Sequence, residues 1–256
     1  MCFSKKNLQK KIKSGDFFLS ALFFLAVLFP LMAFASGSVF VPTPPEKPLR
    51  FCKAIALFIE SIESDSQFVE VSSWPGIQLD LRYASFNNVT GHDLYCGSNR
   101  IFLHREAAAK FKTAILLLQK NHPTYHFVVF DATRPLFAQE RLRAMVRGTP
   151  FAHYVTSPAS GSAHNFGLAI DLSIADSAGN LLDMGTDFDS FEPCAGMQGE
   201  AAALKNGRLN KAQIENRLLL RNVMKRAGFI ALPSEWWHFN AFLSKEIRAN
   251  YTKVRF

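Results

Sequence analysis

The pattern of hydrophobic and polar positions predicts helices and strands in mixed order. In the helical stretches apolar residues recur every three or four positions, whereas the strand stretches alternate or form a short apolar run. The predicted helices are 51–62, 105–120, 135–147 and 210–228, and the predicted strands are 78–83, 125–130 and 168–173. Residues 148–161 and 183–200 lack periodicity and are predicted to be loops.

Local residues support two of these helix boundaries. Pro135 is well placed in the first turn of a helix, and Asn210 with Gln213 three positions later has the pattern of a capping box. The strands and helices follow no regular β-α-β rhythm. The sequence therefore predicts an α+β domain with a central antiparallel sheet flanked by helices.

The N-terminal segment predicts export. Five lysines precede the apolar stretch 17–35, which ends in Ala33-Phe34-Ala35, as in a cleaved secretory signal. An uncleaved anchor is the alternative, since 19 apolar residues are about long enough to cross a bilayer. We expect residues 1–35 to be the signal peptide, 36–70 a proline-rich spacer with a short helix, and 71–256 the catalytic domain. The expected location is the periplasm.

Composition and charge narrow the function classes. Hydrophobic residues make up 48% of the chain and charged residues 20%, which is compatible with a sizeable core. Half of the formal charge of +8 lies in the first 35 residues. The remainder is too small to form a nucleic-acid footprint, so no nucleic-acid partner is expected. Membrane contact is expected only through the signal segment, if it stays uncleaved, and the oligomeric state is not predicted.

The cysteines that follow the signal segment are odd in number: Cys52, Cys96 and Cys194. In an oxidising compartment two of them can form a disulfide, and the sequence does not indicate which two. None has the C-x-x-C spacing of a zinc knuckle, so no cysteine is expected to bind a metal.

Two motifs supply candidate chemistry. Ser162–Leu172 reads S-A-H-N-F-G-L-A-I-D-L and contains His164 and Asp171, and E-W-W-H-F contains Glu235 and His238. Two imidazoles and one carboxylate are a ligand set for a catalytic zinc with an open position for water. A glutamate beside such a site can act as the proton carrier in hydrolysis.

The spacing of these residues constrains the local structure. Residues seven apart on a flat strand face opposite sides, so the chain must bend between His164 and Asp171, and Gly167 can supply the bend. We expect His164 on a loop and Asp171 on the strand 168–173. Glu235 and His238 require a helical turn or a twisted strand entry, and the aromatic residues between them favour the strand.

Six ordered segments resemble the D-alanyl-D-alanine dipeptidases, zinc peptidases related to D-Ala-D-Ala carboxypeptidases and hedgehog-type domains. Besides the two motifs, they are D-L-R-Y-A-S-x-N-N-x-T-G (80–91), D-A-T-R-P (131–135), M-G-T-x-F-D (184–189) and N-R (216–217). The resemblance implies a hedgehog/DD-peptidase-like fold and one zinc ion per chain.

The resemblance also implies a role for each site residue. It makes His164, Asp171 and His238 the zinc ligands and Glu235 the general base on zinc-bound water. Arg134 would stabilise the oxyanion, and Asp189 with Tyr83 would hold the free amino group of the substrate. Ser162 and Asp131 would shape the pocket and orient its polar groups.

The expected function is zinc-dependent hydrolysis of D-alanyl-D-alanine, or a similar small D,D-dipeptide, in cell-wall metabolism. One alternative is a D,D- or L,D-carboxypeptidase that acts on peptidoglycan stem peptides. Another is a non-catalytic zinc-bearing domain that binds peptidoglycan. Exact selectivity and physiological role, whether salvage, wall remodelling or antibiotic tolerance, are not predicted by the sequence.

Overall fold

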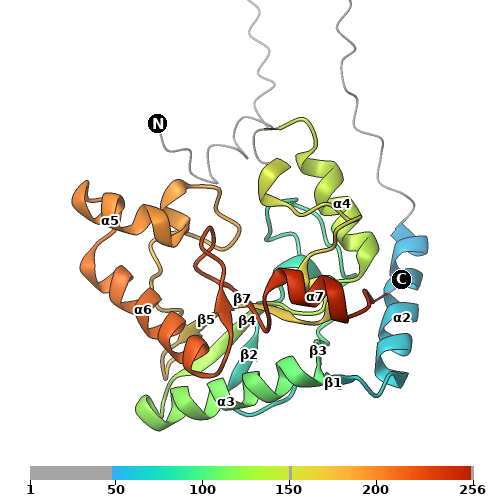
Figure 1. The fold of residues 1–256 in the computed structure, drawn as a ribbon, viewed down its shortest axis with the longest axis horizontal. Coiled ribbons are helices and arrows are strands. Elements are labelled where there is room, and N and C mark those ends of the chain that lie inside the picture. The colour runs from blue at the N-terminus through green and yellow to red at the C-terminus, as the bar shows by residue number, and fades with distance from the viewer. Residues whose placement is uncertain (1–47, 150–151, 255–256) are drawn as a thin grey trace, which may run out of the picture. The chain divides into compact units, whose positions relative to one another are not determined.

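A five-stranded sheet forms the centre of the fold in a computed structural model that describes residues 48–149 and 152–254 (Figure 1). Its strands follow the order β2 (Ile77–Leu79), β4 (His126–Asp131), β5 (Ala169–Ala175), β7 (His238–Asn240) and β6 (Ile230–Ala231). Every residue of β5 is buried. The predicted signal segment 1–35, and residues 36–47 of the predicted spacer, lie outside the described residues.

The sheet is mixed, so the prediction of an antiparallel sheet was wrong for one pairing. The pairs β4–β5, β5–β7 and β7–β6 are antiparallel, whereas β2 runs parallel to β4. Between β2 and β4 the chain passes through β3 (Phe102–His104) and α3 (Arg105–Asn121). A crossover of this length lets a strand return in the same direction. The domain is nevertheless α+β, as predicted.

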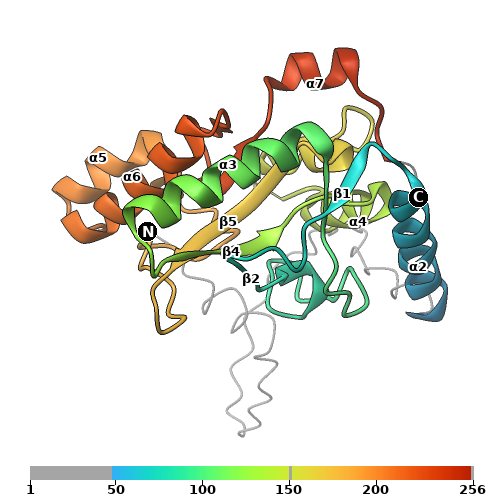
Figure 2. The same cartoon turned by 90° about the horizontal axis from the view of Figure 1, so that it is seen from below.

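Six α-helices occur in the described part of the chain. They are α2 (Pro48–Ser64), α3, α4 (Leu136–Val146), α5 (Met197–Lys205), α6 (Lys211–Arg226) and α7 (Ser244–Asn250). α3 packs against β4 and α6, while α2 lies at the other end of the sheet (Figure 2). Across residues 48–149 and 152–254, none of these helices has the length and apolar character needed to span a membrane.

The predicted helices are all present, with ends that differ by a few residues. Helix 210–228 corresponds to α6, and the side chains of Asn210 and Gln213 each accept a hydrogen bond from the backbone N–H of the other, as a capping box requires. Pro135 lies directly before α4. The helix predicted at 51–62 is α2, which belongs to the same compact unit (residues 49–256) as the sheet.

Two local predictions were wrong. The strand predicted at 78–83 ends at Leu79, and residues Arg82–Ala84 form a 3-10 turn that directs Tyr83 into the protein interior. The loop predicted at 183–200 contains the 3-10 turn Pro193–Ala195 and the start of α5. α5 is a short, alanine-rich helix, so its sequence has high helix propensity but little of the periodicity that marks an amphipathic helix.

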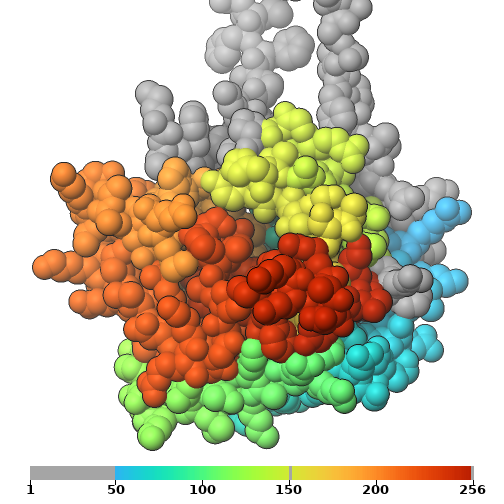
Figure 3. Space-filling view, in the orientation of Figure 1, coloured from blue at the N-terminus to red at the C-terminus, as the bar shows by residue number. Residues whose placement is uncertain are grey.

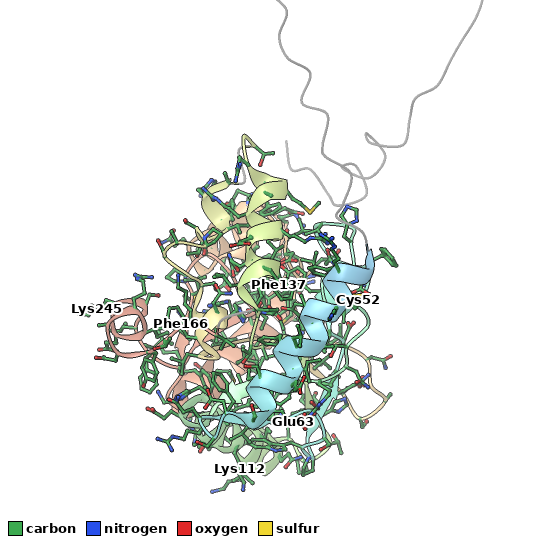
Figure 4. The ribbon with its side chains drawn as sticks, turned by 90° about the vertical axis from the view of Figure 1, so that its right-hand side faces the viewer. Cys52, Glu63, Lys112, Phe137, Phe166 and Lys245 are labelled. Atoms are coloured by element: carbon green, nitrogen blue, oxygen red, sulfur yellow. A yellow bond between two sulfur atoms is a disulfide. The ribbon has the colours of Figure 1, made fainter. Side chains whose placement is uncertain are left out.

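A disulfide bond joins Cys52 on α2 to Cys96, with the Cα atoms 5.4 Å apart (Figure 4). The sequence had left this pairing open. Cys194 lies outside the bond; its buried thiol is 3.4 Å from the Glu192 carboxylate. The disulfide therefore ties the N-terminal helix to the loop between β2 and β3.

Loss of this disulfide is expected to lower the stability of the domain. The cross-link spans 44 positions of the chain, and restricting an unfolded loop of that length stabilises the folded state by up to about 4 kcal/mol. Denaturant unfolding of the double variant Cys52→Ser, Cys96→Ser should show a loss of about 2–4 kcal/mol. Reduced wild-type protein should have the same free energy of unfolding as the variant. Equal stability of the oxidised wild type, the reduced wild type and the variant would contradict the expectation.

Candidate metal centre and substrate cavity

Three different elements bring the predicted metal ligands together. His164 lies in the 3-10 turn η3 (Ala163–Phe166), Asp171 on β5 and His238 at the start of β7. Asp171 is paired with His238 across β5 and β7, so their side chains leave the same face of the sheet. Gly167 directly follows η3, and its φ of 66° turns the chain toward β5. This is the bend that the sequence predicted.

The three side chains converge on one point. His164 Nε2 lies 3.1 Å from His238 Nδ1 and 3.2 Å from the nearer oxygen of Asp171, and His238 Nδ1 lies 2.9 Å from the other Asp171 oxygen. Ligand atoms bound tetrahedrally to one zinc ion at about 2.1 Å are about 3.4 Å apart. The observed spacing needs only a small adjustment to accept such an ion.

The remaining ring nitrogens show which nitrogen of each imidazole is available. His164 Nδ1 donates to the carbonyl oxygen of Ala132 at 2.7 Å, and His238 Nε2 donates to Asn240 Oδ1 at 2.8 Å. In a neutral imidazole the other nitrogen then carries a lone pair. Both lone pairs point toward the Asp171 carboxylate, and oriented imidazoles of this kind are typical of metal sites. The donor set therefore fits a divalent cation.

The charge on Asp171 is stabilised by its neighbours. Burial alone would raise the pKa of this carboxyl, but the imidazoles of His164 and His238, when protonated, outweigh burial and lower the pKa below its ordinary value. Asp171 is therefore anionic at neutral pH, as a candidate ligand of a cation should be. Together with two neutral imidazoles it would leave a bound divalent cation with a net positive charge, which favours acidification of a bound water.

Glu235 lies beside the three ligands, in the turn before β7. Its carboxylate is 3.9 Å from His238 Nδ1, and its side chain is 18% exposed. Burial raises the pKa of this carboxyl to about 7. A carboxylate with a pKa near neutrality can both accept and release a proton in the same reaction cycle. The E-W-W-H segment thus enters the strand only at His238, which leaves Glu235 on a turn over the site.

Arg134 is held at the site by buried acceptors. Its Nε and one terminal nitrogen donate to Asp131 Oδ2 at 2.9 and 2.6 Å, and the other terminal nitrogen donates to Gln139 Oε1 at 2.9 Å. The guanidinium lies over the ring of Tyr83 and 3.9 Å from the Asp171 carboxylate. These contacts fix a positive charge beside the metal ligands.

Asp131 lies beneath Arg134 and does not line the cavity. Its side chain is fully buried, and its second oxygen accepts a hydrogen bond from the hydroxyl of Tyr95 at 2.7 Å. Asp131 also pairs with Asp171 across β4 and β5. Its position is that of a residue that orients Arg134. Tyr95 was missed from the sequence, because a tyrosine with no spacing to a second polar residue gives no signal.

Asp189 and Tyr83 form a second polar pair at the cavity. The Tyr83 hydroxyl donates to the carboxylate of Asp189, with distances of 2.9 and 3.1 Å to its two oxygens. Asp189 has a φ of 58°, a left-handed conformation uncommon outside glycine. Ser162, which precedes η3, also lines the cavity. Of the predicted substrate residues, Asp189, Tyr83 and Ser162 therefore share the cavity with the metal ligands.

The cavity has a volume of about 140 Å³ and opens on the face drawn in Figure 3, between the yellow segment that precedes β5 and the red-orange segment that precedes β7. Sites for drug-sized ligands are usually about 300–1,000 Å³, so this cavity suits a small molecule. Its walls also include residues that the sequence did not single out for binding: Gln139, Tyr154, Val155, Phe191, Ser244 and Arg248. They lie far apart in the chain, and only the fold brings them together.

A buried arginine on α6 holds the segment that carries Asp189. Arg217 donates to the carbonyl oxygens of Met184 at 2.7 Å and Cys194 at 2.6 Å, one on each side of Asp189. It also contacts Thr186 Oγ1, which accepts from the indole N–H of Trp236. Arg217 of the N-R pair noted in the sequence thus links the segment that carries Asp189 to the turn that carries Glu235 through hydrogen bonds.

Comparison with known proteins finds a matching family and relatives that share one name. The sequence profile described as D-ala-D-ala dipeptidase matches residues 65–254. The D-alanyl-D-alanine dipeptidase of Escherichia coli (strain K12) is 35% identical over 166 residues, which cover 65% of this chain and 79% of the relative. The dipeptidase of the same name from Enterococcus faecium is 29% identical over 182 residues (64% and 85%), and that from Synechocystis sp. is 27% identical over 176 residues (57% and 71%).

Proposed function

Since the chain belongs to the D-ala-D-ala dipeptidase family, a family of metallopeptidases, we propose that it hydrolyses D-alanyl-D-alanine or closely similar D,D-dipeptides. The observation that carries the proposal is the presence, in one cavity of about 140 Å³, of a metal-ligand triad and an acidic residue suited to a free amine. The metal-ligand triad would support hydrolysis. The acidic residue would recognise a substrate whose free amino group lies close to the scissile bond.

The cation that fits best is zinc, held by His164 Nε2, His238 Nδ1 and an Asp171 oxygen. Imidazole nitrogens and one carboxylate are a common ligand set of catalytic zinc sites. When bound, zinc supplies Lewis-acid chemistry, which polarises the peptide carbonyl and lowers the pKa of water. The chain's own residues contribute position and proton transfer.

Glu235 and Arg134 divide the remaining chemistry between them. The Glu235 carboxylate accepts a proton from the attacking water and delivers it to the departing amine, so that the hydrolysis of one peptide bond consumes one water and releases two amino acids. The Arg134 guanidinium, fixed by Asp131 and Gln139, donates to the carbonyl oxygen as negative charge develops on it. A preorganised donor stabilises the transition state more than the ground state.

Asp189 provides the proposed selectivity for dipeptides. A substrate amine would replace or join the Tyr83 hydroxyl as a hydrogen-bond donor to the Asp189 carboxylate. Because this carboxylate lies within the cavity, a peptide extended at its N-terminus would bring an uncharged amide to it. The alternative activity, a carboxypeptidase that acts on stem peptides, needs room for a longer substrate and is not supported by a comparable feature of the cavity.

Comparison of D-alanyl-D-alanine with its N-acetyl derivative tests the proposal. Blocking the amine removes the charged hydrogen bond between the substrate and Asp189, which should lower kcat/KM about 30- to 5,000-fold. Release of D-alanine from both compounds, and from a longer D,D-peptide, is measured under the same conditions. Efficient cleavage of the blocked or longer substrate would favour a carboxypeptidase, and hydrolysis of none would contradict the proposed activity.

We further propose that the protein is exported and acts in the periplasm, where the dipeptide arises in cell-wall metabolism. The basic N-terminus and the apolar stretch 17–35 support export. The disulfide between Cys52 and Cys96 supports an oxidising compartment. Fractionation of cells that express the full chain tests the location, and recovery of the mature protein only from the cytosol would contradict it.

A further inference from the structure

A dipeptide is charged at both ends, and the proposed function accounts for only one of them. Asp189 is the proposed partner of the amine, which leaves the carboxylate at the other end of the substrate without a proposed partner. A terminal carboxylate brought into a cavity needs a cation or several donors to offset the loss of its hydration. A cation on the cavity wall that is available to a ligand would meet this need.

Two arginines line the cavity, and they differ in how they are occupied. Arg134 is buried and already donates to Asp131 and Gln139. Arg248, on α7, is exposed to solvent. Within residues 48–149 and 152–254 it forms no ion pair with an acidic side chain, whereas the three arginines Arg82, Arg100 and Arg221 all do. Arg248 is thus a cation on the cavity wall that has no ion-pair partner among the described residues.

The helix presents a second donor beside Arg248. Ser244 lies four residues earlier on α7 and also lines the cavity, and residues four apart share one face of a helix. Both residues therefore line the cavity from the same face of α7. A planar guanidinium matches the geometry of a carboxylate and can bind both of its oxygens.

α7 is anchored where it can hold these donors near the metal ligands. Its one buried residue, Ile247, packs into the main core, and the helix lies against η3, the turn that contains His164. Beyond the helix, the backbone N–H of Val254 donates to the carbonyl oxygen of Asn165 at 2.7 Å. α7 follows β7 near the C-terminal end of the chain, whereas the segment that carries Asp189 follows β5 (Figure 1).

We propose that Arg248, assisted by the hydroxyl of Ser244, binds the C-terminal carboxylate of the substrate. This inference rests on the proposed function and extends it. The substrate is then read at both ends, with its amine at Asp189 and its carboxylate at α7, and its peptide bond is directed to the metal ligands. Peptides with a free carboxylate one residue beyond the scissile bond are the preferred class.

Hydrolysis of D-alanyl-D-alanine and of its C-terminal amide by wild-type protein and by Arg248→Gln tests the inference. The wild-type protein should prefer the free carboxylate by about tenfold or more in kcat/KM, as expected for a hydrogen bond to a charged group. Arg248→Gln should lose most of this preference through a higher KM for the dipeptide, with little change in kcat and none for the amide. Arg248→Lys, which keeps the charge without the planar fork, should fall between the two.

Lys245→Gln provides the matched control. This substitution removes the same charge from α7. Lys245 is exposed and lies outside the cavity lining (Figure 4), so Lys245→Gln should keep the wild-type preference. An undiminished preference in Arg248→Gln, with wild-type turnover of the dipeptide, would overturn this inference alone. If the wild-type protein hydrolysed neither compound, the proposed function would fail and this inference with it.

Discussion

Replacement of Glu235 by glutamine is expected to lower kcat for D-alanyl-D-alanine about 10²–10⁴-fold, the usual contribution of a positioned acid or base. Glutamine keeps the size of the side chain and its place on the turn before β7, but it cannot accept the proton of the attacking water. Glu235 is not among the three groups that converge as metal ligands. The variant should therefore bind as much metal as the wild-type protein.

Metal content and kcat of Glu235→Gln are measured together, with Glu215→Gln as the control. Glu215 is exposed on α6, so its replacement removes a carboxylate without touching the cavity. Activity within a few fold of wild type in Glu235→Gln would remove Glu235 from the mechanism. Loss of metal together with activity would instead give it a role in binding the cation.

The pH dependence of kcat follows from the same carboxylate. Burial raises the pKa of Glu235 to about 7, and only the ionised form can act as the base. As pH falls through the pKa, kcat should drop about tenfold per unit. A bound cation would lower this pKa, so the midpoint of the acid limb should lie at or below pH 7. A midpoint well above 7 would not be compatible with Glu235 as the base.

Replacement of Arg134 by methionine is the second change expected to have a large effect. Loss of one preorganised donor to a developing oxyanion typically costs about 10²–10³ in kcat. KM should change little, because the donor acts mainly in the transition state. Arg134→Lys keeps the charge but cannot reproduce the paired hydrogen bonds to Asp131, so it should recover only part of the loss.

Arg134→Met also leaves the buried Asp131 carboxylate without its ion-pair partner, which can cost about 3–5 kcal/mol of stability. The double variant Asp131→Asn, Arg134→Met removes that charge and should be more stable than Arg134→Met. It should remain as inactive, because the donor is still missing. Recovery of activity along with stability would show that Arg134 acts on the fold and not on the substrate.

The sequence predicts the chemistry of the site better than its surroundings. Metal ligation requires particular residue types, so two short motifs were enough to predict that His164, Asp171 and His238 converge, and the structure brings the three together. The bend at Gly167 followed from the odd spacing between ligands. The strands and helices with strong periodicity were also predicted, because periodicity reports directly which face is buried.

Other features depend on contacts between distant segments and leave no local pattern. The parallel pairing of β2 with β4, the disulfide between Cys52 and Cys96, and the Tyr95 hydrogen bond to Asp131 are all of this kind. Residue type alone also did not place Asp131 beneath Arg134, outside the cavity lining. The likeness to hedgehog-type domains stays a prediction.

The most direct test of the central claim is to locate the metal in crystals of the purified protein by anomalous X-ray scattering at the zinc edge. The account predicts one strong peak, about 2.0–2.2 Å from His164 Nε2, His238 Nδ1 and an Asp171 oxygen. Absence of a peak there, in protein that hydrolyses D-alanyl-D-alanine, would contradict the account, as would an ion bound by other residues.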